Sequence, residues 1–200
     1  MKHLRIGLLL LLGFLATGCG LTNKTILYFN NGKEVTGFGK IHGENGVRFK
    51  TKDSKAQTYN FNDLKKVKIY EGDDINTYVS MKVKGTEKYK IVKEVVLGRV
   101  CLYKKVNEGY VPGTPMGGGF GGAPMMSPGY SYSISNYYVK KEDETEMTYL
   151  GSTSLFSKNF KKAASEYFKD CPSLVAKIQK KELKKKNMVE IVEYYNDNCN

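Results

Sequence analysis

The chain has 200 residues, of which 26% are charged and 40% are hydrophobic. That hydrophobic content is enough to bury a core without metal ions, so a wholly disordered chain is excluded. Lys and Arg number 32 against 20 acidic residues, which gives a formal net charge of +12. With only two His and no Trp, the composition leaves little material for histidine-based catalysis or a zinc site.

The first 18 residues have the pattern of an export signal. A basic start with Lys2 and Arg5 is followed by an apolar stretch over 6–15 and by small residues before Cys19. A membrane span is the alternative, but a span needs about 20 apolar residues, and polar residues follow this stretch too soon. We therefore predict a signal peptide over 1–18, whose removal lowers the net charge from +12 to +10.

The residues around Cys19 predict a lipid anchor. The segment Leu-Ala-Thr-Gly-Cys over 15–19 resembles the lipobox of bacterial lipoproteins, although Leu15 stands one position before the usual Leu. In that family the cysteine thiol receives a diacylglyceryl group, and cleavage leaves the cysteine as the first residue. Gly20, in place of an Asp, by the same resemblance favours the outer membrane and its periplasmic leaflet. Ordinary secretion, or display at the cell surface, is the alternative.

Beyond a short linker over 19–24, apolar residues recur with the period of two that is typical of strands. Asn-Gly pairs at 31–32 and 45–46 indicate tight hairpin turns. After residue 157 the period becomes helical, with Ser157 as a candidate helix cap. We predict an α+β fold, in which an antiparallel sheet or small SH3-like barrel over about 25–150 is followed by a helical tail over 157–198 that packs on it.

Residues 111–131 are rich in Gly, Met and Pro and predict a flexible loop. The loop offers apolar side chains to a partner protein, namely Met116, Phe120, Met125, Met126 and Tyr130. A dispensable insert is the alternative. Its glycines lack the Gly-Lys-Ser/Thr ending of a phosphate-binding loop, so we predict no phosphate site.

The helical tail carries a dense group of lysines. The candidate basic patch consists of Lys177, Lys180, Lys181, Lys184, Lys185 and Lys186. Helical spacing predicts that several of them share one solvent-exposed face, which could bind anionic lipid or an anionic glycan. A simple solvated surface is the alternative, and export argues against nucleic acid as a partner.

With Cys19 assigned to lipid, three cysteines remain, and an oxidising envelope allows two of them to pair. Cys171 ends the first tail helix and Cys199 follows the last, so a bridge between them would tie the tail together. Cys101 lies in an apolar strand and suits a buried thiol. We predict the pair Cys171–Cys199, with free thiols or another pairing as alternatives.

No catalytic group, cofactor site or metal site is predicted. His42 is the only His left after the signal is removed, and no nucleophile motif accompanies it. Paired carboxylates, as in glycosidases, have no spacing that a sequence reveals. An envelope hydrolase is therefore the alternative to a non-enzymatic protein.

Four segments carry a resemblance to a family. They are Gly-Lys-Glu-Val-Thr-Gly over 32–37, Leu-Gly-Arg-Val-Cys-Leu-Tyr over 97–103, Phe-Lys-Asp-Cys-Pro over 168–172 and Val-Glu-Tyr-Tyr-Asn over 192–196. In this order the chain resembles exported lipoproteins of the Bacteroidetes type, whose module also stands ahead of some outer-membrane β-barrels. The resemblance implies a fold and a location but no activity. We predict a scaffold or binding module at the outer membrane, anchored by its lipid.

Overall fold

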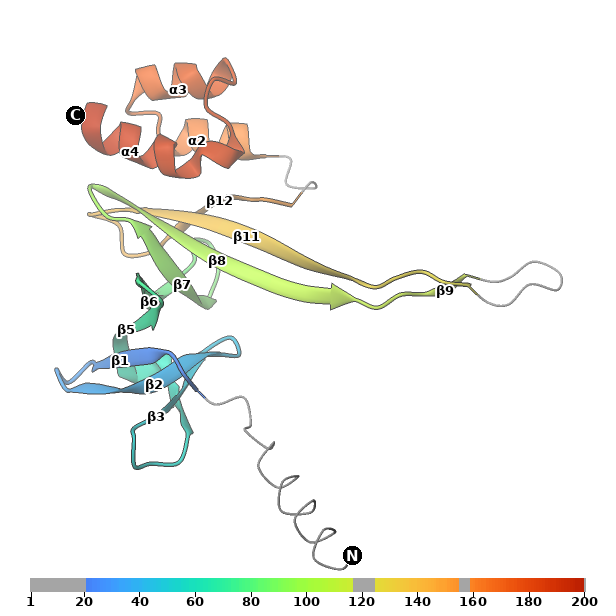
Figure 1. Cartoon of the computed structure of the whole chain (residues 1–200). Helices are drawn as coiled ribbons and strands as arrows, with labels where there is room; N and C mark the ends of the chain where they lie inside the picture. Colours follow the sequence, from blue (N-terminus) through green and yellow to red (C-terminus); the bar gives the residue numbers. More distant parts are fainter. Residues whose placement is uncertain (1–20, 117–124, 155–158, 200) are drawn as a thin grey trace, which may run out of the picture. The chain divides into compact units, whose positions relative to one another are not determined.

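The structure is a computed structural model that describes residues 21–116, 125–154 and 159–199. The chain forms two compact units that divide between Ile75 and Asn76, and each unit has its own antiparallel strands (Figure 1). The sequence pattern had indicated one strand-rich domain over 25–150. The signal peptide and Cys19 lie outside the described residues.

The first unit consists of five antiparallel strands and a short 3-10 helix. Hydrogen-bonded neighbours follow the order β5-β1-β2-β3-β4. The elements are β1 Lys24–Phe29, β2 Glu34–His42, β3 Gly46–Lys50, β4 Gln57–Asn60, η2 Phe61–Asp63 and β5 Leu64–Glu71. The predicted alternation is present, because Val67 and Ile69 of β5 are buried while their neighbours Lys66 and Lys68 are half-exposed. One face of these strands therefore makes a core.

Glycines make the turns of this unit. The predicted turn over 30–32 is confirmed, and Gly32 has a φ of 85°, which a glycine adopts without strain. The next turn differs from the pattern, which pointed to Asn45-Gly46. Gly43 takes the positive φ of 64° there, and Gly46 is the first residue of β3.

The core of the first unit contains two buried phenylalanines, Phe49 and Phe61, and Phe49 is the more fully buried. Other fully buried residues of this core are Leu27, Val47, Val67 and Ile69. Phe49 of β3 is the register partner of Gly39 in β2. A Cβ at Gly39 would lie 3.3 Å from Phe49 Cδ2 and 2.9 Å from the Arg48 carbonyl oxygen. The absence of a side chain at Gly39 thus lets the Phe49 ring approach the backbone of β2.

The second unit contains five antiparallel strands, a short two-stranded hairpin and three α-helices. Its strands follow the order β6-β7-β8-β11-β12, and β9 pairs with β10. The strands are β6 Asp74–Lys82, β7 Tyr89–Val96, β8 Val100–Val111, β9 Pro115–Met116, β10 Met125–Met126, β11 Tyr130–Lys141 and β12 Thr148–Ser152. The antiparallel strands form an open sheet, so the alternative of a closed barrel is not realised.

The central strands β8 and β11 are buried on both faces near their base. Leu102 and Val139 are register partners whose side chains enter the core beneath the helices. The adjacent partners Tyr103 and Tyr138 enter a second core on the opposite face, with Met147. Burial on both sides explains the continuous apolar runs that the sequence shows in this region.

The predicted helical tail is confirmed as three short helices that pack on one face of this sheet (Figure 1). They are α2 Phe160–Tyr167, α3 Pro172–Gln179 and α4 Met188–Asn198, with the 3-10 helix η3 Lys185–Asn187 before the last. Pro172 occupies the first turn of α3, where its missing N–H costs nothing. The candidate cap Ser157 lies outside the described residues, and α2 begins after Asn159, whose side chain makes no capping hydrogen bond.

One disulfide closes the tail. Cys171 immediately precedes α3 and Cys199 follows α4, and their Cα atoms are 5.5 Å apart. The predicted pairing of these two cysteines is therefore present, and Cys101 is a half-buried free thiol. The bridge joins residues 28 positions apart, so it removes conformational freedom from the unfolded tail.

We expect the double substitution Cys171→Ala/Cys199→Ala to lower the free energy of unfolding by about 3–4 kcal/mol, because loop-closure entropy is restored to the unfolded chain. Urea denaturation without reductant measures the loss. Cys101→Ala is the control, since this thiol closes no loop. Equal stability of the double variant and the wild type would contradict the structural role of the bridge.

Candidate functional site

A two-stranded hairpin extends from the second unit, well beyond the helices (Figure 1). Near its base β8 pairs with both β7 and β11, but the β7 register ends at Lys104 and the β12 register ends at Asn136. Thr153 still exchanges hydrogen bonds with Ser135. Further out, β8 and β11 pair with each other and with no other described strand. We call the described residues 106–116 and 125–134 the arm.

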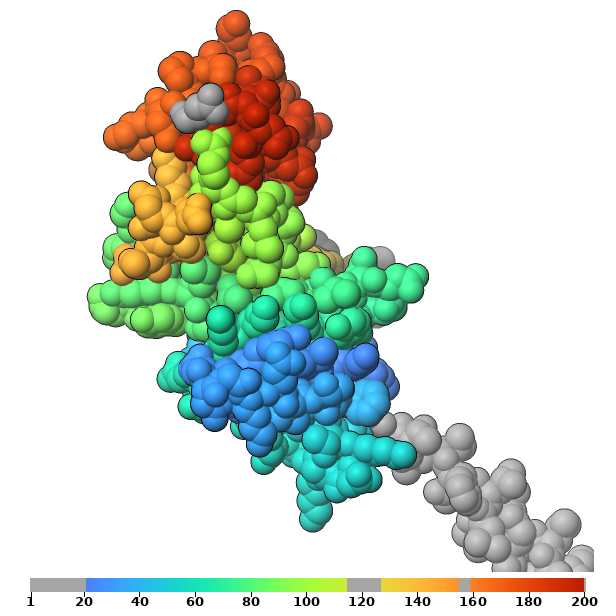
Figure 2. Space-filling model, turned by 90° about the vertical axis from the view of Figure 1, so that its left-hand side faces the viewer, coloured from blue at the N-terminus to red at the C-terminus, as the bar shows by residue number. Residues whose placement is uncertain are grey.

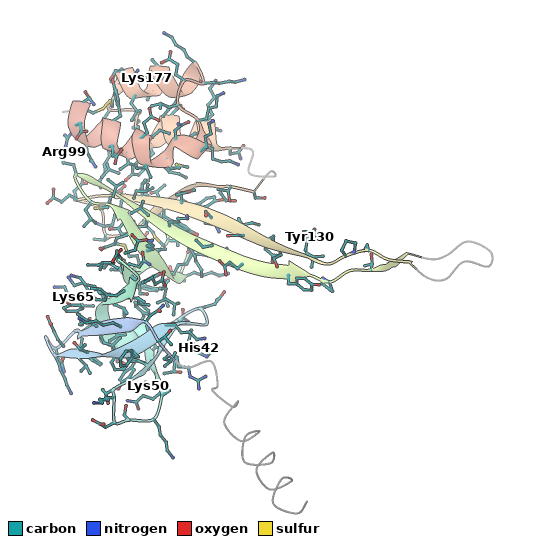
Figure 3. The ribbon with its side chains drawn as sticks, viewed as in Figure 1. His42, Lys50, Lys65, Arg99, Tyr130 and Lys177 are labelled. Atoms are coloured by element: carbon teal, nitrogen blue, oxygen red, sulfur yellow. A yellow bond between two sulfur atoms is a disulfide. The ribbon has the colours of Figure 1, made fainter. Side chains whose placement is uncertain are left out.

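The arm exposes a set of apolar side chains. Its exposed large residues are Val106, Tyr110, Val111, Tyr130 and Tyr132. Tyr130 is 62% exposed and lies far out along the hairpin (Figure 3). Tyr130 and Val111 are register partners, and Tyr132 lies two residues further along the same face. The arm therefore presents an aromatic stripe that no described residue covers.

Cross-strand packing holds part of this stripe in place. Tyr132 is the register partner of Gly109, and a Cβ at Gly109 would collide with the Tyr132 ring. On the opposite face, a Cβ at Gly129 would collide with Tyr110. An aromatic ring packed over a glycine of the neighbouring strand protects the backbone there. The glycines of the arm thus give its tyrosines a defined position.

The residues proposed from the sequence as a partner loop fall at the outer end of the arm. Strand pairing continues further than predicted, because Met116 pairs with Met125 and Met126 with Pro115. The ends of the predicted loop over 111–131 are therefore strand. Phe120 lies outside the described residues.

The predicted basic patch does not share one helical face. The helix α3 ends at Gln179, so Lys177 is the only one of the six in an α-helix, while Lys185 and Lys186 lie in the 3-10 helix η3. Between the two helices the backbone reverses at Lys181, whose φ is 63°. Lys177 pairs with Glu182 at 3.8 Å, and Lys185 donates to the carbonyl of Ser154 at 2.8 Å. The remaining lysines are exposed, namely Lys180, Lys181, Lys184 and Lys186. The prediction of one shared helical face was wrong because a run of lysines carries no signal for where a helix ends.

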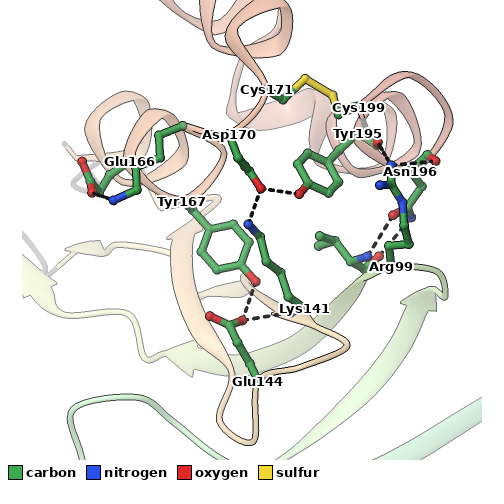
Figure 4. A network of polar contacts seen from close by, with 12 residues as sticks. Arg99, Lys141, Glu144, Glu166, Tyr167, Asp170, Cys171, Tyr195, Asn196 and Cys199 are labelled. Atoms are coloured by element: carbon green, nitrogen blue, oxygen red, sulfur yellow. Dashed lines mark hydrogen bonds and ion pairs between the residues drawn. A yellow bond between two sulfur atoms is a disulfide. The ribbon is translucent and has the colours of Figure 1, made fainter.

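A polar network fastens the tail to the base of β11 (Figure 4). Lys141 Nζ donates to Asp170 Oδ2 at 2.6 Å, and the Tyr195 hydroxyl donates to the same oxygen at 2.7 Å. Nearby, the Tyr167 hydroxyl donates to Glu144 Oε2 at 2.6 Å. The ammonium of Lys141 also lies 5.5 Å from the centre of the Tyr195 ring. It also lies 5.7 Å from the centre of the Tyr167 ring, so residues of α2 and α4 surround the ammonium group that β11 supplies.

These contacts shift the pKa values of the groups involved. Burial would raise the pKa of Asp170, but the hydrogen bonds from Lys141 and Tyr195 outweigh it, so this pKa lies below its usual value. Burial would lower the pKa of Lys141, but the bonds to Asp170 and Tyr195 raise it. Burial, followed by the bond to Glu144, raises the pKa of Tyr167. All three groups keep the charge state that the network needs at neutral pH.

A second set of contacts lies at the start of β8, beside the first network, because Val100 is the register partner of Lys141. The Asn196 side chain accepts from the Val100 N–H at 2.9 Å and donates to the Val100 carbonyl at 3.0 Å, as a neighbouring strand would. Arg99 donates to the Tyr195 carbonyl at 3.1 Å. These bonds join α4 to the start of β8. Arg99, Lys141, Asp170 and Tyr195 also line a shallow open pocket of about 520 Å³.

The network serves packing better than acid–base chemistry. A general acid at neutral pH needs a raised carboxyl pKa, whereas that of Asp170 is lowered. Among the described residues no group of His, Cys, Asp and Glu side chains is arranged to hold a metal ion, and His42 lies exposed at the end of β2. Within the same residues no helix is long and apolar enough to cross a membrane.

Sequence reasoning missed two kinds of residue. Tyr132, Tyr110 and Val111 of the arm were absent from the predicted partner surface, although the alternation of Tyr and Ser over 130–134 carries a strand signal. The network of Lys141 with Asp170 left no signal, because the two residues lie 29 positions apart.

Comparison of the chain with protein-family models, curated proteins and solved structures finds no match. The resemblance to exported lipoproteins therefore stays a prediction from the four segments that carry it.

We expect Asp170→Asn to lower the free energy of unfolding by about 1 kcal/mol at neutral pH, because two charge-assisted hydrogen bonds are lost from a half-exposed position. The folded-state pKa of Asp170 is depressed, so its contribution is present above the reference pKa of 3.8 and is lost as the pH falls through the folded value. The difference between the variant and the wild type should therefore shrink in acid, as urea denaturation across pH would measure.

The matched control is Glu166→Gln. Glu166 pairs with Lys169 at 3.2 Å on the surface of the same tail and with no other described residue, and exposed pairs contribute little. A loss of stability in this control equal to that of Asp170→Asn would contradict a specific role for the network.

Proposed function

We propose that the protein is a non-enzymatic binding module or scaffold of the cell envelope, held at the outer membrane through a lipid on Cys19. In this proposal the arm is the surface that contacts a partner protein. The observation that carries it is the exposed aromatic stripe of Tyr130, Tyr132 and Val111. It lies on strands that, within the described residues, pair with each other alone at that point.

The physical chemistry of the arm supports binding. A two-stranded hairpin is marginally stable in water by itself, and open strand edges are places where another strand can add. Tyrosine is enriched at protein interfaces because its ring gives a large contact area while its hydroxyl stays satisfied. A partner that pairs with an arm edge and covers Tyr130 and Tyr132 would use both features.

Two alternative functions, an envelope hydrolase and a binder of anionic lipid or glycan, have less structural support than the binding module. An envelope hydrolase would need a pair of carboxylates with separated pKa values, and Asp170 is engaged as a structural anion. Binding of anionic lipid or glycan through the tail would rest on four exposed lysines, since Lys177 and Lys185 have partners of their own.

Lipidation is tested by metabolic labelling of growing cells with a fatty-acid probe. The wild-type chain should carry the label in the envelope fraction, and Cys19→Ser should abolish it, because the thiol is the acceptor. Cys101→Ser is the matched control and should stay labelled. Persistent labelling of Cys19→Ser would end the lipoprotein proposal.

The arm is tested with a photoreactive amino acid at Tyr110 in intact envelopes. We expect a crosslinked product whose yield falls about tenfold when Tyr130→Ser and Tyr132→Ser are combined, because interface tyrosines often contribute 1.4 kcal/mol or more, as a rough guide. The same photoreactive group at Tyr89, which is 60% exposed in the same unit, is the control and should give no such product.

Equal crosslinking from Tyr110 and Tyr89, or a yield that the two substitutions leave unchanged, would remove the arm from the proposal. Tyr130 and Tyr132 lie outside both cores of the second unit, so the unfolding midpoint should stay near the wild-type value and serve as the check on folding. Tyr130→Ser alone keeps the Tyr132 ring over Gly109 and should already lower the yield.

A further inference from the structure

The outward face of the first unit gathers cations from four strands. Register partners in antiparallel strands share a face. Lys24 of β1 is the partner of Phe38 in β2. On the same face of β1, Ile26 and Tyr28 are the partners of Lys68 and Lys66 in β5. Continuing the alternation gives one set of outward positions. The cations of this set are Lys24, Lys40, Arg48, Lys50, Lys66 and Lys68. We call this set the basic face.

The basic face has a strong excess of positive charge. Its strand positions include one carboxylate, Glu34, at the far end of β2. None of the six cations forms a salt bridge with another residue in the described part of the chain. Like charges on neighbouring strands repel one another, so this arrangement lowers stability unless an anionic partner neutralises it.

The opposite face of the same strands carries the core, which leaves the basic face uncovered by its own unit. Thr25, Leu27, Val67 and Ile69 alternate with the outward positions and are buried. The only helix among the described residues of this unit is η2, over three residues. The atoms of β1 and β2 lie at the surface of the unit, in blue in Figure 2.

Aromatic rings hold three of the cations in place. Lys66 Nζ lies 4.9 Å and Lys68 Nζ 5.7 Å from the centre of the Tyr28 ring, and Lys24 Nζ lies 5.1 Å from that of Tyr70. Ammonium groups thus occupy ring faces on which a sugar would stack. This arrangement favours headgroup phosphates over a glycan as the anionic partner.

The basic face begins close to Cys19 in the sequence, which indicates that the membrane supplies those phosphates. Cys19 precedes Lys24 by five residues, and a fully extended chain spans at most about 17 Å over that length. A lipid on Cys19 would therefore keep the start of β1 near the headgroups. Salt screens the attraction between charges over about 10 Å at moderate concentration, and the tether holds Lys24 at a comparable distance.

We infer that the basic face binds the anionic lipid surface of the membrane in which the protein is anchored, and so acts as a second anchoring signal. The inference rests on the proposed lipidation of Cys19 for its geometry. A basic patch beside a lipid chain is a known way to make anchoring stable and to orient a protein on the bilayer. The face would orient the first unit with β1 and β5 against the headgroups.

The test uses residues 20–200, which lack the lipid, so that it does not depend on Cys19. The protein is sedimented with vesicles of phosphatidylcholine alone or mixed with phosphatidylglycerol. We expect binding only to the mixed vesicles, weakened by salt. Each cation near an anionic surface contributes roughly fivefold to binding, so Lys24→Gln/Lys66→Gln/Lys68→Gln should lower affinity roughly 100-fold.

The matched control is Lys180→Gln/Lys181→Gln/Lys186→Gln, which removes the same charge from exposed positions of the tail. It should bind nearly as the wild type does, and Lys24→Arg/Lys66→Arg/Lys68→Arg should keep the affinity because the charge is retained. If the Gln triple fails to fold, Lys40→Gln/Arg48→Gln/Lys50→Gln tests the same face from β2 and β3.

Equal losses for the sheet and tail variants would overturn the inference, because net charge alone would then explain binding. Tighter binding to the acidic polysaccharide polygalacturonate than to the mixed vesicles would also overturn it, in favour of a glycan. If the protein carries the fatty-acid label but does not bind the mixed vesicles, the role of the basic face is refuted and lipidation of Cys19 stands. If it binds the vesicles but carries no label, lipidation is refuted and the role of the basic face stands.

Discussion

The pairing of β8 with β11 is the constraint on which the second unit depends. At its base this pair is buried on both sides, with Leu102 and Val139 beneath the helices and Tyr103 and Tyr138 in the opposite core. A shift of the register by one residue would exchange the two sets of side chains. Large aromatic rings would then face the helices, so both cores specify the same register. The helical tail, its network and its disulfide all build on this platform.

The arm is the continuation of this pair past its neighbours. Where β7 and β12 stop, the buried residues stop as well, and the same alternation now exposes tyrosines on both faces. The rigid base gives the arm a defined starting direction, and the packing of Tyr132 over Gly109 extends order outward. A binding element built in this way loses less conformational entropy on contact than a free loop of equal length would.

Positive charge has different consequences in the two units. In the tail, Lys141 is neutralised by Asp170 and shielded by aromatic rings, so its charge contributes to packing. In the first unit, Lys24, Lys66 and Lys68 lie over tyrosine rings, and none of them pairs with a carboxylate of a described residue. A ring fixes the position of an ammonium group but leaves its charge available to solvent and to anions. The overall excess of Lys and Arg therefore says less about function than the location of the unpaired cations does.

Local patterns determined much of this protein, since they depend on residues close in the sequence. The alternation of strands, the turn at Gly32 and the start of α3 at Pro172 could be predicted in this way. The pair Cys171–Cys199 spans 28 positions and was predicted differently, because only three cysteines remain once Cys19 is assigned to lipid. The length of β8 could not, because a Gly-rich and Pro-rich segment gives no sign that its ends will pair. Only the tertiary structure brought Lys141 to Asp170 and aligned lysines of β1 and β5 on one face. These contacts depend on strand register and on helix packing between distant segments. Both are fixed by burial of the cores, and no spacing between neighbouring residues encodes them.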